Sequence, residues 1–207
     1  MVLDSSQAGC FEEYRAGRNV GIFACAGSGK SVLLRAIIRD AVNSWGAGSV
    51  AVCSWYGAAA DLIGGTTLNS FFGVGVFLAT PDQFLAAAKA RSRLATKLRQ
   101  VRVLVIDEVF TITSRWLVVY LKILRGLAPA GAQQHPAGGV QVIGMLVIAC
   151  PSRLRWKPPV QFGCVRVPLH HFILFLTSVS LILLLPLSCT CSDCPFKLLE
   201  IPCRLFP

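Results

Sequence analysis

Short apolar runs alternate with helical patterns over about the first 147 residues. Four runs have the length and composition of buried strands: 19–24, 49–53, 103–106 and 140–146. Between them, the spacing of apolar positions predicts helices over 29–42, 80–99 and 116–127. Thr80 is the expected N-cap of the second helix, with Pro81 in its first turn. Strands that alternate with helices predict an α/β fold with a parallel sheet covered on both faces.

The pattern changes after Gly144. Prolines recur every few positions, leucine is abundant, and no strand or helix period persists. We therefore expect an α/β lobe over 1–147 and an irregular apolar extension over 148–207. No residue from 167 to 192 is formally charged, and this stretch approaches the roughly 20 residues that cross a bilayer. A membrane anchor is thus conceivable only through 167–192.

Composition narrows the class of protein without choosing its partner. The chain has 207 residues, of which 54% are hydrophobic and 14% charged, and this combination excludes a disordered chain. Its net charge of +10 favours a polyanionic partner: nucleic acid, nucleotide phosphates or anionic lipid. The chain opens without the basic start and apolar run of a secretory signal.

The strongest chemical signal is the segment ACAGSGKS at 24–31, which follows a predicted strand and opens a predicted helix. Glycines let the backbone N–H groups curl around phosphate oxygens, and the helix N-terminus adds positive charge. Lys30 would reach the β and γ phosphates, and Ser31 would hold Mg²⁺. Ala24 stands where the usual pattern has glycine; this costs little if its φ is negative and is strained if φ is positive. The expected ATP-binding residues are Ala26, Gly27, Ser28, Gly29, Lys30 and Ser31.

The third predicted strand ends in two carboxylates, Asp107 and Glu108. Beside a phosphate loop, an acid at this strand end helps to hold Mg²⁺, and a following glutamate can activate water as a base. The sequence therefore predicts Asp107 as a metal ligand, with Lys30 and Glu108 as the catalytic residues.

These segments together resemble the Pif-type DNA helicases, RecD-like members of helicase superfamily 1. The resemblance rests on Gln7, the AGSGKS loop, the segment 57–73 and LVIDE at 104–108, and it covers about 4–146. It implies a RecA-like lobe that hydrolyses ATP to unwind DNA 5′-to-3′. It further implies roles in DNA repair, recombination and telomere maintenance, in the nucleus or alternatively the mitochondrion.

Carried over by match, Gln7 would contact the adenine of ATP. Single-stranded or forked DNA would follow the segment from 57 to 72, with Gly57, Thr67, Asn69 and Phe72 as expected contacts. Asn69 replaces a histidine of the family pattern, and Trp55 and Tyr56 stand where small polar residues are usual. These departures weaken the expected coupling to DNA more than the expected binding of ATP.

The resemblance ends inside a motif. Residues 138–144 follow the family pattern, but its Gly-Asp and the glutamine that senses the γ-phosphate do not appear after them. A second lobe with an arginine finger is also absent from the sequence, so we expect a fragment that cannot unwind DNA alone. Our favoured interpretation of the apolar extension is translation of non-coding or out-of-frame sequence, over a membrane anchor or a segment packed on the lobe. Two other functions stay open: a nucleotide- and DNA-binding lobe without turnover, and a membrane-anchored P-loop protein.

A basic segment and a cysteine-rich segment are less specific patterns. Six basic residues lie between 89 and 102 without an acid among them, and positions 89, 93 and 97 would share one helix face. They suit either a phosphate-tracking stripe for single-stranded DNA or a solvated surface. Near the end, cysteines at 189, 191 and 194 with histidines at 170 and 171 lack the spacing of a standard zinc site, so zinc is not expected.

Overall fold

The computed structural model describes residues 3–25, 27–75, 79–148 and 162–166. The strands are β1 (Val20–Cys25), β2 (Val50–Ser54), β3 (Thr66–Thr67), β4 (Val103–Asp107), β5 (Gln141–Ile148) and β6 (Phe162–Arg166). The α-helices are α1 (Ser5–Arg15), α2 (Lys30–Trp45), α3 (Gly57–Leu62), α4 (Leu68–Phe72), α5 (Pro81–Ala90), α6 (Ser92–Gln100) and α7 (Ser114–Leu127). Short 3₁₀ turns are η1 (Ala47–Ser49), η2 (Val109–Thr111) and η3 (Ala130–Ala132).

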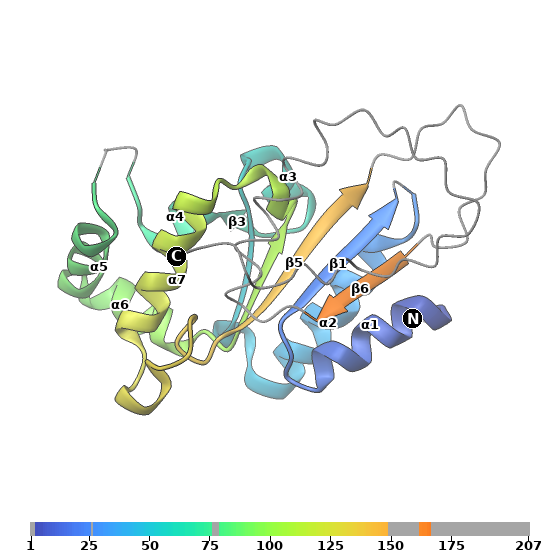
Figure 1. The fold of residues 1–207 in the computed structure, drawn as a ribbon, viewed down its shortest axis with the longest axis horizontal. Coiled ribbons are helices and arrows are strands. Elements are labelled where there is room, and N and C mark those ends of the chain that lie inside the picture. Colours follow the sequence, from blue (N-terminus) through green and yellow to red (C-terminus); the bar gives the residue numbers. More distant parts are fainter. Residues whose placement is uncertain (1–2, 26, 76–78, 149–161, 167–207) are drawn as a thin grey trace, which may run out of the picture.

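One sheet runs through the described part of the chain in the order β3-β2-β4-β5-β1-β6 (Figure 1). The first five strands are parallel, and β6 is antiparallel to β1. The α/β fold and the four strands expected from the sequence are therefore confirmed. Because β5 pairs with both β1 and β4, it separates the strand before the phosphate loop from the strand that ends in Asp107.

Two apolar layers hold the helices on the sheet. In β4 every residue is buried, and successive side chains alternate between the layers, as strand geometry requires. Leu104 and Ile106 join the layer beneath α4 to α7, whereas Val103 and Val105 join the layer beneath α1 and α2. A central strand buried on both faces explains why this run of the sequence is apolar without interruption.

The helix expected over 80–99 is instead two helices. Thr80 is the N-cap, as expected, and forms a capping box with Gln83, while Pro81 begins α5. Arg91 then leaves helical geometry, with φ −91° and ψ 89°, and its Nη1 donates to the carbonyl of Gly73 at 2.9 Å. The single-helix prediction was wrong because this break lets α5 and α6 each turn an apolar side to the core, which the helical period alone does not reveal.

The extension over 148–207 is not irregular throughout. Residues 162–166 form β6, which pairs along β1 from Val20 to Ala24. The open edge of β1 presents unpaired N–H and C=O groups, which favour the addition of a strand. Strand β5 also continues to Ile148, so it crosses the boundary that we placed after residue 147. That division into two segments stays a prediction.

The remaining expectations for the extension lie outside the described residues. These are the uncharged stretch 167–192 and the cysteine and histidine group between 170 and 194. Among the residues that the structure describes, no helix has the length and apolar character needed to cross a membrane.

A buried glutamine ties the first helix to the sheet and supplies a test of the packing. Gln141 is 9% exposed, and its Nε2 donates to the carbonyls of Tyr14 at 2.8 Å and Arg18 at 2.7 Å. Gln141→Leu leaves those carbonyls without this donor, so we expect the free energy of unfolding to fall by about 2–3 kcal/mol in urea titrations.

The control is Gln133→Leu, because Gln133 is exposed and donates to the carbonyl of Ala128 at 2.9 Å. Its loss should change the free energy of unfolding by no more than about 0.5 kcal/mol. Equal losses in the two variants would contradict the role given to Gln141.

Candidate functional site

The phosphate loop joins the carboxyl end of β1 to the N-terminus of α2. Gly27 and Gly29 have φ of 78° and 86°, the left-handed region that glycine adopts without strain. Ala24 lies within β1 and is buried, and its φ is not positive, because Glu108 is the only described non-glycine residue with a positive φ. The alanine in place of the usual glycine is therefore compatible with the loop.

The loop also holds an unsatisfied polar atom. The hydroxyl oxygen of Ser28 is buried and has no hydrogen-bond partner within the described residues. A buried polar group without a partner is costly, so a ligand that supplies an acceptor oxygen at this loop would be stabilised. Together with the backbone turns at Gly27 and Gly29, this favours an oxyanion such as phosphate.

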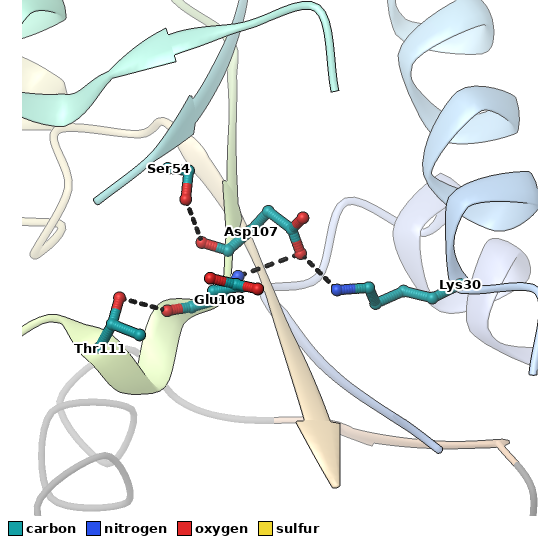
Figure 2. A network of polar contacts seen from close by, with 5 residues as sticks. All are labelled: Lys30, Ser54, Asp107, Glu108 and Thr111. Atoms are coloured by element: carbon teal, nitrogen blue, oxygen red, sulfur yellow. Dashed lines mark hydrogen bonds and ion pairs between the residues drawn. The ribbon is translucent and has the colours of Figure 1, made fainter. Parts of the chain in front are cut away.

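Lys30 and Asp107 form the centre of the site. The Nζ atom of Lys30 lies 2.7 Å from Oδ1 of Asp107, and their side chains are only 16% and 9% exposed (Figure 2). Lys30 follows the loop after β1, whereas Asp107 ends β4, and β5 lies between these two strands, so the contact spans the carboxyl edge of the sheet. A partly buried ammonium and carboxylate are available here to exchange partners with a charged ligand. The structure thus brings together the two residues that the sequence singled out as phosphate and metal ligands.

Ser31 and Asp107 fit a magnesium ion by chemistry. Ser31 lies in the first turn of α2, exposed beside the loop, and offers a hydroxyl oxygen. Asp107 offers a carboxylate, and hydroxyl and carboxylate oxygens suit Mg²⁺ when phosphate oxygens and water complete its shell.

Glu108 adopts an unusual backbone conformation directly after Asp107. Its φ of 51° and ψ of 43° are left-handed, which costs a non-glycine residue about 1–2 kcal/mol. Its carbonyl accepts from the hydroxyl of Thr111 at 2.8 Å and from the amide of Thr111 at 2.9 Å, and its amide donates to Asp107 Oδ1 at 3.0 Å (Figure 2). These bonds hold Glu108 in a fixed place at the end of β4. Backbone strain that hydrogen bonds maintain in this way is frequent at active sites, where a side chain must have a defined position.

Ser54 is a part of the site that the sequence did not point to. It is completely buried at the end of β2, opposite Asp107 in the sheet register, and its Oγ donates to the Asp107 carbonyl at 3.3 Å. The bond joins the ends of β2 and β4 (Figure 2). In the sequence, Ser54 is visible only as a serine that ends the apolar run VAVCS. Its position opposite Asp107 follows from the pairing of β2 with β4, which the sequence does not show.

Gln7 reaches the phosphate loop from α1. It is 5% exposed; its Oε1 accepts from the amide of Asp4 at 3.2 Å, and its Nε2 donates to the carbonyls of Ser28 at 3.4 Å and Gly29 at 3.5 Å. The structure thus places Gln7 against the loop, where it supports the loop backbone. Its contact with adenine stays a prediction.

The residues expected to contact DNA differ in their solvent exposure and in their hydrogen bonds. Gly57 is exposed at the start of α3, and Thr67 caps α4 by accepting from the amide of Ser70 at 3.3 Å. Asn69 is half-buried, and its Oδ1 accepts from the Tyr120 hydroxyl at 2.7 Å. Burial raises the pKa of Tyr120, so its hydroxyl remains protonated and keeps this donor role. Gly57 and Thr67 lie at the carboxyl edge near the phosphate loop.

Phe72 does not suit the role of a DNA contact. It is 1% exposed and stacks on Tyr120, with ring centroids 4.8 Å apart. Phe71 is also buried, edge-on to Phe72. Because α4 turns both rings into the core, neither offers a free face on which a base could stack. Tyr56, in contrast, is 55% exposed at the start of α3.

The basic stripe expected on one helix is divided between two. Lys89 lies on α5, whereas Arg93 and Lys97 lie on α6 beyond the break at Arg91. The three positions therefore do not share a single helix face.

Strand β5 ends without the polar group that the family pattern places there. Met145 and Leu146 are buried, and the strand continues by pairing Val147 with Ala24 and Ile148 with Cys25. The carboxyl end of β5, which lies between β1 and β4, thus consists of apolar residues. Neither Met145 nor Leu146 carries a group that could hydrogen-bond a γ-phosphate.

Comparison with known proteins identifies this arrangement. The family model for PIF1-like helicases matches residues 3–145. The ATP-dependent DNA helicase Pif1 of Bdellovibrio bacteriovorus is 33% identical over 143 residues, which make up 69% of this chain and 31% of that protein. The crystal structure of Pif1 helicase from Candida albicans is similar with a TM-score of 0.64 and 30% identity, over 70% of this chain and 32% of that one.

A third relative has ligands bound. Pif1 helicase from Bacteroides, in complex with ADP-AlF3 and single-stranded DNA, has a TM-score of 0.56 and 26% identity, over 71% of this chain and 32% of that one. The chain thus spans about a third of the length of these three relatives. The parallel sheet, the loop at Lys30 and the acids at the end of β4 all lie within the matched residues, and this chain belongs to the PIF1-like helicase family.

Proposed function

We propose that this chain forms the nucleotide-binding lobe of an ATP-dependent DNA helicase that moves 5′-to-3′ along DNA. The observation that carries the proposal is the 2.7 Å contact between Lys30 and Asp107 across the carboxyl edge of the sheet. It places a cation at the start of α2 and a carboxylate at the end of β4 in the same small volume, as binding of a metal-nucleotide requires.

The site residues then take distinct roles. Lys30 and the N–H groups of Gly27, Ser28 and Gly29 would bind the phosphates, and Gln7 would contact the adenine. Ala26, the other residue expected at the phosphates, lies outside the described residues. Ser31 and Asp107 would hold Mg²⁺, which neutralises charge on the phosphates when bound. Glu108 would take a proton from the attacking water, because it lies next to the metal ligand at a fixed position.

Single-stranded DNA is the proposed polymer, and the tail of a forked substrate is its proposed source. The support is the exposure of Gly57 and the position of Thr67 at the same edge of the sheet as the phosphate loop, with Asn69 following on α4. Family membership further favours a role in DNA repair, recombination and telomere maintenance, in the nucleus or alternatively the mitochondrion.

The aliphatic end of β5 favours a second candidate function. Because Met145 and Leu146, which lie between β1 and β4, offer no polar side chain to respond to the γ-phosphate, binding of ATP need not lead to efficient hydrolysis. The chain would then be a nucleotide-dependent DNA-binding lobe with little turnover.

Binding and turnover measured on the 207-residue chain distinguish the two functions. Binding of a fluorescent ATP analogue that depends on Mg²⁺ and is lost in EDTA is expected under both. Phosphate release that single-stranded DNA raises at least about tenfold supports the helicase lobe, whereas binding without DNA-stimulated release supports the second function. No binding of nucleotide with Mg²⁺ would contradict both.

A further inference from the structure

Six exposed basic residues lie on α5 and α6, between them or just after α6, on the side of the sheet that α4 to α7 cover. We call this surface the basic face, and it consists of Lys89, Arg91, Arg93, Lys97, Arg99 and Arg102. On α6, Ala95 and Leu98 point into the core, while Arg93, Lys97 and Arg99 are exposed on the outward side. The helical period therefore separates an apolar inner side from a cationic outer side.

The charge of the basic face is uncompensated within the described structure. The chain has no Asp or Glu between Asp82 and Asp107. Of α5, α7 and η1, which pack on α6, only α5 contains an acid, Asp82, and it pairs with Lys122 at 2.7 Å. From α4, which has no acid, the Phe71 ring lies 4.2 Å from Nζ of Lys97. None of the six basic residues takes part in an ion pair among the described residues. Uncompensated positive charge of this density attracts a polyanion.

The basic face extends away from the nucleotide site. At one end, Arg91 contacts the carbonyl of Gly73, just after α4. At the other end, the amide of Arg102 donates to the carbonyl of Ser49, and the carbonyl of Arg102 accepts from the amide of Gln141, so Arg102 lies where β2, β4 and β5 begin. This is the opposite edge of the sheet from the phosphate loop. The basic face is therefore distinct from the proposed single-strand path, which begins at Gly57 and Thr67.

The side chains on this surface select the kind of polyanion. Single-strand binders combine positive charge with exposed aromatic rings for base stacking, and interfacial membrane helices combine it with exposed apolar residues. The large hydrophobic residues exposed in the described structure are Trp45, Tyr56, Leu62 and Val118, and none of them is on α5 or α6. A surface that offers only cations fits a partner that presents only phosphates, as duplex DNA does with its bases stacked inside.

We propose that the basic face binds the phosphate backbone of duplex DNA, as a second nucleic-acid site beside the proposed single-strand path. The contact carries no sequence information, because it uses no base edges. On a forked substrate it would hold the duplex arm while the single strand occupies the other edge of the sheet.

The test uses a blunt 25-base-pair duplex and an oligothymidine strand, with the 207-residue chain and no nucleotide, so that its result does not depend on ATP hydrolysis. The variant Arg93→Gln/Arg99→Gln removes two exposed charges from α6. We expect duplex affinity at 50 mM salt to fall about tenfold, and the slope of log affinity against log salt to flatten by about two. The affinity for oligothymidine should change less than about twofold.

The matched control is Arg35→Gln/Arg39→Gln, which removes two exposed charges from α2 on the other face of the sheet. It should leave duplex affinity within about twofold of the unchanged chain. An unaltered salt slope in the basic-face variant, an equal loss in the control, or a larger loss for oligothymidine than for duplex would each overturn the proposal. Binding to anionic vesicles in place of duplex would overturn it as well.

Discussion

Lys30→Ala is expected to lower the affinity of the chain for Mg²⁺-ATP by about 10- to 100-fold and to abolish measurable phosphate release. Hydrogen bonds to charged groups are worth about 1.5–3 kcal/mol, and each 1.4 kcal/mol is a factor of ten in affinity. The expected loss is at the upper end because the Lys30 ammonium is only 16% exposed, where water screens its charge poorly. Isothermal titration and a phosphate-release assay measure the two effects.

Lys30 has a second function that this substitution disturbs. Its ammonium pairs with Asp107, whose side chain is 9% exposed and whose Oδ1 also accepts from the amide of Glu108. When ATP and Mg²⁺ bind, the ammonium would pass to the phosphates and the carboxylate to the metal, so each charge exchanges one partner for another. Alanine leaves Asp107 with the amide of Glu108 alone, and a modest fall in melting temperature is expected together with the loss of binding.

Lys122→Ala is the matched control for Lys30→Ala. Lys122 also lies 2.7 Å from a carboxylate, that of Asp82, but this pair joins α7 to α5 and the Asp82 side chain is 76% exposed. An exposed pair contributes little, so this variant should bind ATP with unchanged affinity. If Lys30→Ala binds Mg²⁺-ATP as tightly as Lys122→Ala does, the phosphate-binding role of Lys30 is wrong.

The features that the sequence predicts correctly depend on patterns of residues that are adjacent along the chain. The apolar runs gave the strands, the turn from β1 into α2 gave the loop, and the acids at the end of β4 followed directly from the run VLVID. Even so, the contact of Lys30 with Asp107 joins residues 77 positions apart. The sequence predicts that both residues belong to the nucleotide site, because a phosphate loop and a strand-terminal acid together bind a metal-nucleotide, but it does not predict that the two side chains pair.

The features that the sequence did not reveal depend on tertiary contacts. The break at Arg91 follows no proline or glycine; the hydrogen bond of its guanidinium to Gly73 lies at this point. Phe72 is buried because α7 brings Tyr120 over it, and Ser54 matters because β2 happens to pair with β4 at Asp107. Hydrophobic patterning shows that a residue prefers burial, but the partner that buries it is chosen by the whole fold.

Glu108→Gln is expected to leave Mg²⁺-ATP binding within about threefold and to lower DNA-stimulated phosphate release by at least about 100-fold. The amide keeps the size and hydrogen-bonding shape of the side chain but cannot accept a proton from water, and general base catalysis contributes about 10²- to 10⁴-fold. Rapid-quench measurement of a single turnover separates this loss from any change in product release. Glu12→Gln, on the exposed side of α1, removes the same charge away from the site and should leave both quantities unchanged.

Glu108→Gly separates catalysis from stability. The left-handed backbone at this residue, with φ of 51°, costs glutamate about 1–2 kcal/mol, whereas glycine adopts it freely and loses about 0.5–1 kcal/mol through the entropy of the unfolded chain. We therefore expect the glycine variant to be at least as stable in urea as the unchanged chain, and yet to hydrolyse ATP no faster than Glu108→Gln. A less stable variant would show that the left-handed turn at Glu108 carries no strain. A variant that retains DNA-stimulated phosphate release would show that another group activates the water.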